Sequence, residues 1–141
     1  MTDLKQKIIA KMKQPALASF ATVTDNNKPW ARYVVVLADD DLNIWFATRR
    51  ASRKTVHIAH NPEVHLTLGV TDMSTAESYL QIEGRAEILN DDASKKAVWY
   101  DLLENVFKGP EDPDYCVCKV IPYRIEFITM DPAEPPEVWK P

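Results

Sequence analysis

The feature that most constrains this fold is a series of short apolar segments separated by very short polar turns. Residues 16–24, 29–37 and 42–48 are rich in β-branched and aromatic side chains, and the turns between them carry Asp and Asn. A parallel crossover needs about a dozen residues, so strands this close in sequence must pair antiparallel. The sequence therefore predicts an antiparallel meander over its first third.

Periodicity predicts further strands and three helices. Apolar and polar residues alternate over 63–70 and over 78–89, which predicts a strand in each segment. One or two last strands are predicted within 115–129. The helices indicated by apolar residues three and four apart are 3–13, a short helix reaching about His60, and 92–107. About six strands, mainly sequential and without βαβ alternation, predict a mainly β fold, an antiparallel β-barrel with peripheral helices.

We expect a single domain over residues 1–141, with an irregular proline-rich tail from 131 to 141. Gly84 stands in the apolar row of its strand, where we expect the barrel to bend or another chain to approach closely. Pro122 falls within the last strand segment and predicts a bulge or a sheet edge.

Composition argues against several functional classes. The chain has only three glycines, which supply neither a GxGxxG fingerprint nor a Walker A loop. Its net charge of −4 disfavours binding to nucleic acid. No apolar run approaches the roughly 18 residues of a membrane span, and the N-terminus has no apolar signal core, so we expect a cytoplasmic protein with no membrane partner. Cys116 and Cys118 are too close in sequence for an unstrained disulfide, and we expect reduced thiols.

Charge is distributed unevenly, with net +4 over residues 1–70 and net −8 over residues 71–141. The basic segment 49–54 opens the short helix, with Ser52 as its predicted N-cap. Cations in a first helical turn oppose the helix dipole, and a bound phosphate would resolve that conflict. Arg32 could reach the same point if its strand pairs with the next one. A solvated basic loop is the alternative, and the residues alone leave both open.

Five motifs follow one another in a characteristic order. They are Arg32, Phe46-Ala47-Thr48, Ser52-Arg53-Lys54, Asn61-Pro62-Glu63-Val64 and Ile82-Glu83-Gly84-Arg85-Ala86. In this order they resemble the pyridoxamine 5'-phosphate oxidase-like flavoproteins, whose fold is the FMN-binding split barrel. The resemblance covers residues 5–128 and is nearest to the general stress protein 26-like branch, where a helix with a Trp precedes a Gly-(x)-x-Asp-Pro loop. Here these features are Trp99 and the loop Gly109-Pro110-Glu111-Asp112-Pro113.

The resemblance implies an obligate homodimer with FMN in two clefts at the subunit interface. Residues 52–54 and Arg32 would hold the phosphate, Thr48 and its neighbours would line the ribityl chain and ring, and residues 33–35 would run beside the isoalloxazine edge. A family glutamine that contacts the flavin aligns with Tyr79. The residues expected to bind the cofactor are Arg32, Tyr33, Val34, Val35, Ala47, Thr48, Ser52, Arg53, Lys54, Tyr79 and Gln81.

The resemblance favours a flavin-dependent oxidoreductase acting on a small soluble substrate, with no catalytic residue and no metal site identified. The true oxidases end in an arginine-rich segment that binds the substrate, whereas this chain ends Glu137-Val138-Trp139-Lys140-Pro141, so pyridoxamine phosphate oxidation is not expected. The alternatives are a non-catalytic flavin carrier or sensor, and a binder of F420 or haem in the same cleft. His57 and His60 form a conceivable metal pair, and Trp139 could cover the cleft or a subunit seam.

Overall fold

The computed structural model describes residues 2–141, which form a barrel of long strands with short helices around it. In chain order the elements are α1 (Thr2–Met12), β1 (Ala16–Val23), β2 (Pro29–Ala38), β3 (Ile44–Arg49), α2 (Arg53–His60), β4 (Glu63–Leu68), the 3₁₀ helix η1 (Met73–Thr75), β5 (Ser78–Leu89), α3 (Asp92–Val98), the 3₁₀ helix η2 (Asp101–Asn105), β6 (Tyr115–Thr129) and β7 (Glu137–Trp139). Within residues 2–141, no helix combines the length and the apolar character needed to cross a membrane.

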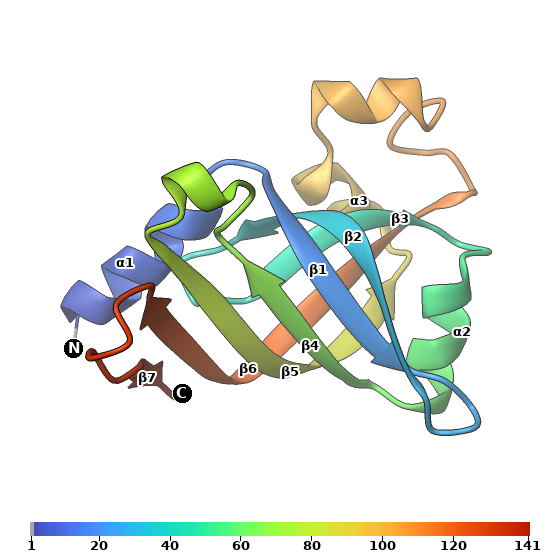
Figure 1. The fold of residues 1–141 in the computed structure, drawn as a ribbon. Coiled ribbons are helices and arrows are strands. Elements are labelled where there is room, and N and C mark those ends of the chain that lie inside the picture. Colours follow the sequence, from blue (N-terminus) through green and yellow to red (C-terminus); the bar gives the residue numbers. More distant parts are fainter. Residues whose placement is uncertain (1) are drawn as a thin grey trace.

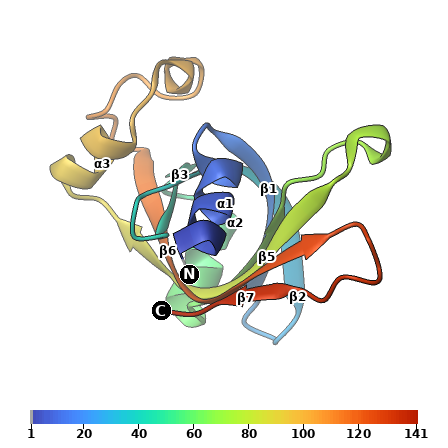
Figure 2. The same cartoon turned by 90° about the vertical axis from the view of Figure 1, so that its left-hand side faces the viewer.

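Six of the strands form a closed antiparallel barrel. Along the sheet their order is β3-β2-β1-β4-β5-β6, and β3 pairs again with β6, which closes the ring. Strands joined by short connections pair directly, as β1 does with β2 and β4 with β5. α1 and α2 lie at opposite ends of the barrel (Figure 1), and the view along the barrel in Figure 2 shows α1 across its near end. The predicted antiparallel barrel with peripheral helices is therefore confirmed.

β6 has 15 residues and pairs with two different strands along one of its edges. Its first part pairs with β3 and its last part with β7, while β5 runs along the other side. The register of β5 and β6 shifts between Glu83 and Gly84, opposite Pro122. A Cβ added at Gly84 would lie 2.7 Å from the carbonyl oxygen of Ile121, closer than real Cβ atoms approach. The expected bend at Gly84 and the bulge at Pro122 are thus confirmed, the close approach to Gly84 comes from β6 of the same chain, and the last strand is continuous.

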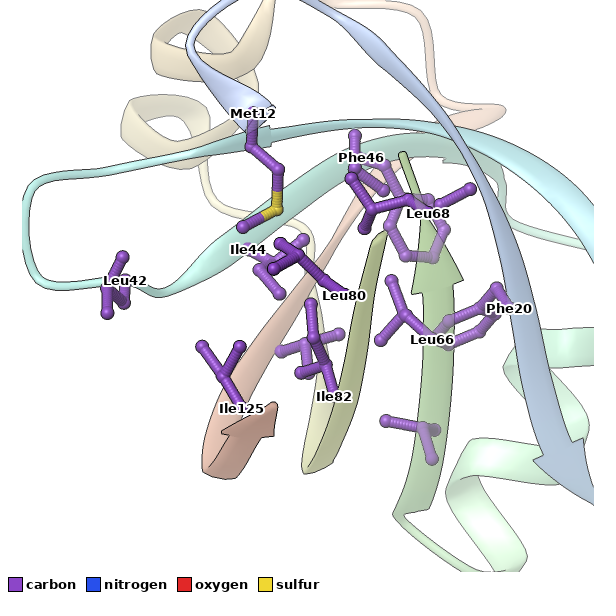
Figure 3. Close-up of a cluster of buried hydrophobic side chains, with 14 of the residues drawn as sticks. Met12, Phe20, Leu42, Ile44, Phe46, Leu66, Leu68, Leu80, Ile82 and Ile125 are labelled. Carbon is purple, nitrogen blue, oxygen red and sulfur yellow. The ribbon is translucent and has the colours of Figure 1, made fainter. Parts of the chain in front are cut away.

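The barrel interior is packed by alternate residues of the strands, as the period of two requires. Figure 3 shows these side chains converging from several strands. The rings of Phe20 and Phe46 meet edge-on with centroids 4.9 Å apart, and fully buried Ile8 and Met12 close the α1 end. A second, smaller cluster lies outside the barrel and consists of Val98, Leu103, Phe107, Tyr115 and Val117.

The prediction of one helix over 92–107 is wrong. α3 ends at Val98, and the backbone is extended at Trp99 and Tyr100 before η2 begins. The Trp99 ring packs edge-on against Tyr115 with centroids 5.5 Å apart, which anchors the extended segment to the second cluster. Tertiary packing therefore overrides the helical spacing of the apolar residues here.

The prediction of an irregular tail is wrong at its end, where β7 pairs with β6. β3 pairs only with the first part of β6, so the backbone further along is free for another strand. Lys7 of α1 forms an ion pair with Glu137 at 2.5 Å, and Trp139 packs against the main core. Each of these contacts joins the tail to residues that are distant in the sequence, so the composition of the tail could not predict them.

The third strand begins at Ile44 rather than at Leu42. Leu42 ends the preceding turn with a left-handed φ of 65° and is fully buried. The carboxylate of Asp39 stabilises that turn by accepting hydrogen bonds from the amides of Asp41 and Asn43. An apolar side chain in this position thus belongs to the turn and not to the strand.

Candidate cofactor site

A cleft of about 540 Å³ opens where β2 and β3 diverge, between these strands, the start of α2, and η2. The two strands pair only near Leu37 and Ala38, and the cleft occupies the space beyond. Its volume is ordinary for a small-molecule site. The residues predicted from the sequence that line it together are Tyr33, Val34, Val35, Ala47, Thr48, Ser52 and Lys54.

One end of the cleft is basic. Lys54 lines it, and Arg32 is close enough for the two charges to repel each other; Arg53 repels Arg32 in the same way. Burial is the larger cause and this repulsion the smaller cause of a lowered pKa at both Arg32 and Lys54. The ion pairs found within residues 2–141 include none of these three side chains. Such a cluster favours an anion as its missing partner.

Neutral groups hold the two arginines in place. Arg32 donates to the carbonyl oxygens of Phe20 at 3.3 Å and Trp30 at 3.2 Å, and to Thr22 Oγ1 at 2.7 Å. The guanidinium of Arg53 lies 4.9 Å from the centroid of the Trp30 ring, within the range of a cation–π contact. Both side chains are therefore fixed while their charges stay uncompensated.

Ser52 occupies the N-cap position of α2, as the sequence predicts, with φ of −69° and ψ of 154°. Its hydroxyl makes no capping hydrogen bond and lies 3.3 Å from Thr48 Oγ1. The first turn of α2 contains no acidic residue. The free amides of that turn and the Ser52 hydroxyl thus add hydrogen-bond donors to the positive end of the cleft.

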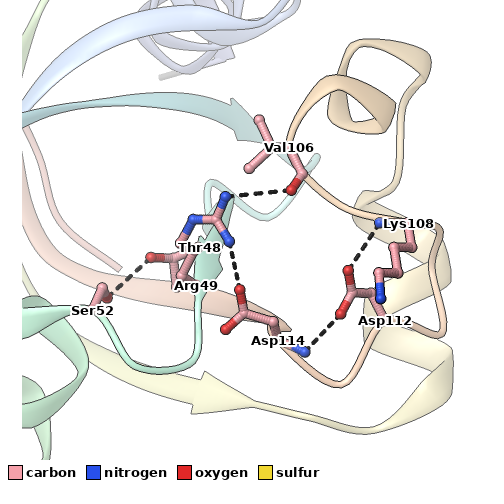
Figure 4. Close-up of polar contacts among 7 residues, drawn as sticks. All are labelled: Thr48, Arg49, Ser52, Val106, Lys108, Asp112 and Asp114. Carbon is pink, nitrogen blue, oxygen red and sulfur yellow. Dashed lines mark hydrogen bonds and ion pairs between the residues drawn. The ribbon is translucent and has the colours of Figure 1, made fainter.

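Arg49 belongs to the same basic segment and also lines the cleft, but it is already paired with an acid. Its Nη1 contacts the Asp114 carboxylate at 2.5 Å, and its Nη2 donates to the carbonyl oxygen of Val106 at 3.4 Å (Figure 4). Asp112 accepts hydrogen bonds from the amides of Lys108 and Asp114, which hold the pKa of Asp112 below its usual value. Arg49 therefore ties the loop before β6 to the cleft.

The wall formed by η2 and its neighbours escaped the sequence prediction. It consists of Tyr100, Leu102, Leu103, Val106 and Phe107. Leu102 is 69% exposed, although its spacing predicts the buried face of a helix. The apolar residues of this wall have the same spacing as the buried face of a helix, so the sequence pattern could not distinguish the two.

Tyr79 and Gln81 do not reach this cleft within one chain. Tyr79 lines a second cavity, of about 410 Å³, which shares Tyr33 with the cleft. The register of β2, β1, β4 and β5 puts Gln81 three strand spacings from Tyr33, which is about 14 Å. The seven residues of the cleft and Tyr79 of the second cavity thus form two groups that meet at Tyr33, whereas Arg32, Arg53 and Gln81 line neither cavity.

The other candidate residues lie elsewhere. Cys116 and Cys118 are free and buried, and burial raises the pKa of both thiols, as expected for reduced cysteines. Within residues 2–141, no three metal-ligating side chains come together. Trp139 packs on the main core and does not line the cleft.

Comparison with known proteins identifies the family. The sequence pattern of the family described as Pyridoxamine 5'-phosphate oxidase matches residues 4–129. General stress protein 26 of Bacillus subtilis is 30% identical over 133 residues, which is 94% of each chain. The crystal structure of General Stress Protein 26 from Bacillus anthracis has a TM-score of 0.83 at 31% identity and covers 98% of each chain.

A pyridoxine/pyridoxamine 5'-phosphate oxidase of Cupriavidus taiwanensis is 34% identical over 89 residues. That match covers 63% of this chain and 41% of the oxidase, so the chain spans under half the length of such relatives. The family pattern's match, over residues 4–129, contains the strands and the basic segment that build the cleft. The chain therefore belongs to the pyridoxamine 5'-phosphate oxidase family and has its split-barrel fold.

Proposed function

We propose that this chain binds FMN in the cleft and acts as a flavin-dependent oxidoreductase on a small soluble substrate. The observation that carries the proposal is the set of three cations, Arg32, Arg53 and Lys54, that have no acidic partner within residues 2–141. A phosphate monoester carries about 1.5–2 negative charges at neutral pH and accepts charge-assisted hydrogen bonds from such groups. FMN joins a phosphate of this kind to a flat, largely apolar ring.

The cleft offers partners for each part of that ligand. Ser52, Lys54 and the first-turn amides of α2 would hold the phosphate, with Arg32 and Arg53 beside them. The segments 47–48 and 33–35 line the cleft beyond the basic end and would contact the ribityl chain and the ring. When bound, the flavin supplies hydride or single-electron transfer. The chain anchors and orients it, and the η2 wall excludes water from it.

A homodimer would unite the two groups of predicted cofactor residues. The cavity that contains Tyr79 adjoins an outer face of β1 and β2 on which Leu17, Tyr33 and Val35 are exposed. Soluble monomers rarely leave an extended apolar surface of this kind uncovered. A two-fold axis through this face would bring the Tyr79 cavity of one protomer against the cleft of its partner and complete two flavin sites.

The chromophore that co-purifies with the native protein tests the cofactor. We expect FMN in one-to-one ratio with the chain, identified after heat release by chromatography and absorbance, and a dimer in sedimentation velocity. F420 or haem in its place would overturn the proposal, as would an apoprotein that fails to bind added FMN.

Anaerobic reduction separates an enzyme from a carrier or sensor. Bleaching of the visible flavin absorbance by NADH or NADPH, followed by recovery when an electron acceptor is added, supports an oxidoreductase. A bound flavin that neither nucleotide reduces, but that dithionite does reduce, would favour the carrier or sensor instead.

A further inference from the structure

A series of polar contacts connects Arg32 to helix α2 through a buried threonine. Arg32 Nη1 donates to Thr22 Oγ1 at 2.7 Å, and Thr22 Oγ1 lies 2.8 Å from His57 Nδ1. Arg32 Nη2 lies 3.4 Å from the same ring nitrogen. Thr22 is only 1% exposed, so water cannot replace its partners. Side chains from β1, β2 and α2 thus form one unit at the α2 end of the barrel.

Hydrogen-bond chemistry fixes the direction of these contacts. A guanidinium can only donate, so the Thr22 oxygen accepts from Arg32 and its own proton is free to go to His57 Nδ1. Nδ1 must accept, because Arg32 Nη2, 3.4 Å away, can only donate, and the Thr22 hydroxyl then donates to the same nitrogen. His57 is therefore neutral, with its hydrogen on Nε2.

The charges around His57 maintain this neutral form. Burial is the largest cause of its lowered pKa, followed by repulsion from Arg32 on β2; Arg53 on α2 acts in the same direction. Asp25, in the turn between β1 and β2, acts in the opposite direction and has a larger effect than Arg53. A second positive charge between the two arginines is thus disfavoured.

His57 also contacts the aromatic ring on which Arg53 rests. The rings of His57 and Trp30 meet edge-on with centroids 5.8 Å apart, and the Arg53 guanidinium lies 4.9 Å over Trp30. Arg53 and His57 are four residues apart on α2 and therefore share one face of that helix. One imidazole thus supports both unpaired arginines.

We propose that His57 and Thr22 are positioning residues that hold Arg32 in reach of a phosphate bound at Ser52–Lys54. The inference rests on the proposed function, because it concerns the same phosphate. A neutral acceptor is the suitable group for this task. A carboxylate in its place would form an ion pair with Arg32 and withdraw the guanidinium from the ligand, as Asp114 does with Arg49.

The ratio of the dissociation constants of riboflavin and FMN isolates the contribution of the phosphate, since the two ligands differ in that group alone. We expect His57→Leu and Thr22→Val each to lower this ratio about tenfold, through weaker FMN binding. Riboflavin binding should not change. His57→Asn keeps an acceptor and should restore most of the ratio. His60→Leu, on an exposed position of the same helix, is the matched control and should behave like the wild type.

Flavin-fluorescence titration measures both constants, and thermal denaturation shows which variants are folded. A wild type that binds both flavins equally would overturn the proposed phosphate anchor, and this inference with it. A large wild-type ratio that both His57→Leu and Thr22→Val leave intact would overturn this inference alone. Equal losses for FMN and riboflavin would mean that the pair only supports the fold. If His57→Leu does not fold, Thr22→Val decides the question by itself.

Discussion

Arg49 and a cluster of three other cations have opposite surroundings in the fold, although Arg49 shares one short basic segment with two of them. Arg49 meets the acidic loop before β6, where Asp114 neutralises it. Arg53 and Lys54 follow within a few residues, and Arg32 joins them from β2, yet no acid within residues 2–141 pairs with any of these three. Each of these four side chains carries one positive charge, and Arg49 differs from the other three in the acid that the fold brings to it.

This difference distinguishes a cation that stabilises the fold from cations that are available to bind a ligand. A matched arginine holds two segments together, whereas cations that repel one another gain most from an anionic ligand. The acidic second half of the chain reaches Arg49 through Asp114 but reaches none of the three cations at the α2 end of the barrel. Positive charge in a sequence therefore indicates a binding site only where the fold supplies no acid of its own.

The largest expected effect is the loss of FMN affinity when Arg53 and Lys54 are both replaced by Ala. Each charge-assisted contact contributes roughly 1.5–3 kcal/mol, so the dissociation constant should rise by about two to four orders of magnitude. Flavin-fluorescence titration measures it. Arg49→Ala is the control: Arg49 also lines the cleft, but Asp114 already neutralises it, so the affinity should stay nearly unchanged. Equal losses in the two variants would remove the distinction between the two groups.

Inorganic phosphate should stabilise the free protein through the same three cations. At ten times its dissociation constant, a bound ion adds about 1.4 kcal/mol to the free energy of unfolding, which is about 4–7 °C in Tm. Thermal denaturation in phosphate and in chloride of equal ionic strength measures the difference. The effect should persist in Arg49→Ala and vanish in the variant that lacks Arg53 and Lys54. Identical melting in both salts would argue against an anion site.

Arg49→Ala should lower stability without weakening ligand binding. The pair with Asp114 is half exposed, with side-chain exposures of 55% and 42%, so solvent screening limits its contribution to about 1 kcal/mol or less. Urea denaturation of Arg49→Ala, Asp114→Ala and the double variant gives the coupling free energy. A coupling of zero would show that the two residues are not held together in solution.

The smallest effect concerns pH and His57. Its folded pKa is lowered from the ordinary 6.5, so the unfolded chain takes up the proton first as the pH falls. This residue's contribution to stability is therefore complete above pH 6.5 and is lost as the pH falls from there through the lower folded pKa. Urea denaturation at about pH 7.5 and about pH 5.5 should show a larger loss for the wild type than for His57→Asn. An equal loss in both would mean that His57 is not kept neutral by its cationic neighbours.

Short-range pattern predicted most of the fold and the centre of the site. Alternation and turn chemistry predicted the antiparallel strands, and Gly84 marked the bend because only a residue without Cβ fits beside Ile121. The basic segment and the resemblance brought seven of the predicted cofactor residues to one cleft. These features depend on neighbours in sequence or on motifs whose spacing is fixed by the barrel.

The misses depend on contacts between distant residues. Trp99 leaves its helix to pack on Tyr115, and this turns the expected helical face into a wall of the cleft. β7 exists because β3 leaves part of β6 unpaired, and nothing in the tail itself indicates that. The sequence also could not separate Arg49 from Arg53, since the acid that pairs with Arg49 lies 65 residues away.

The most direct test of the proposed phosphate site is a calorimetric comparison of FMN and riboflavin binding to the wild-type protein. The two ligands share the ring and the ribityl chain, so the difference in their binding free energies reports on the phosphate and the three unpaired cations. We predict that FMN binds at least about a hundredfold more tightly, and that the difference shrinks as salt is added. Equal affinities at low salt would contradict it.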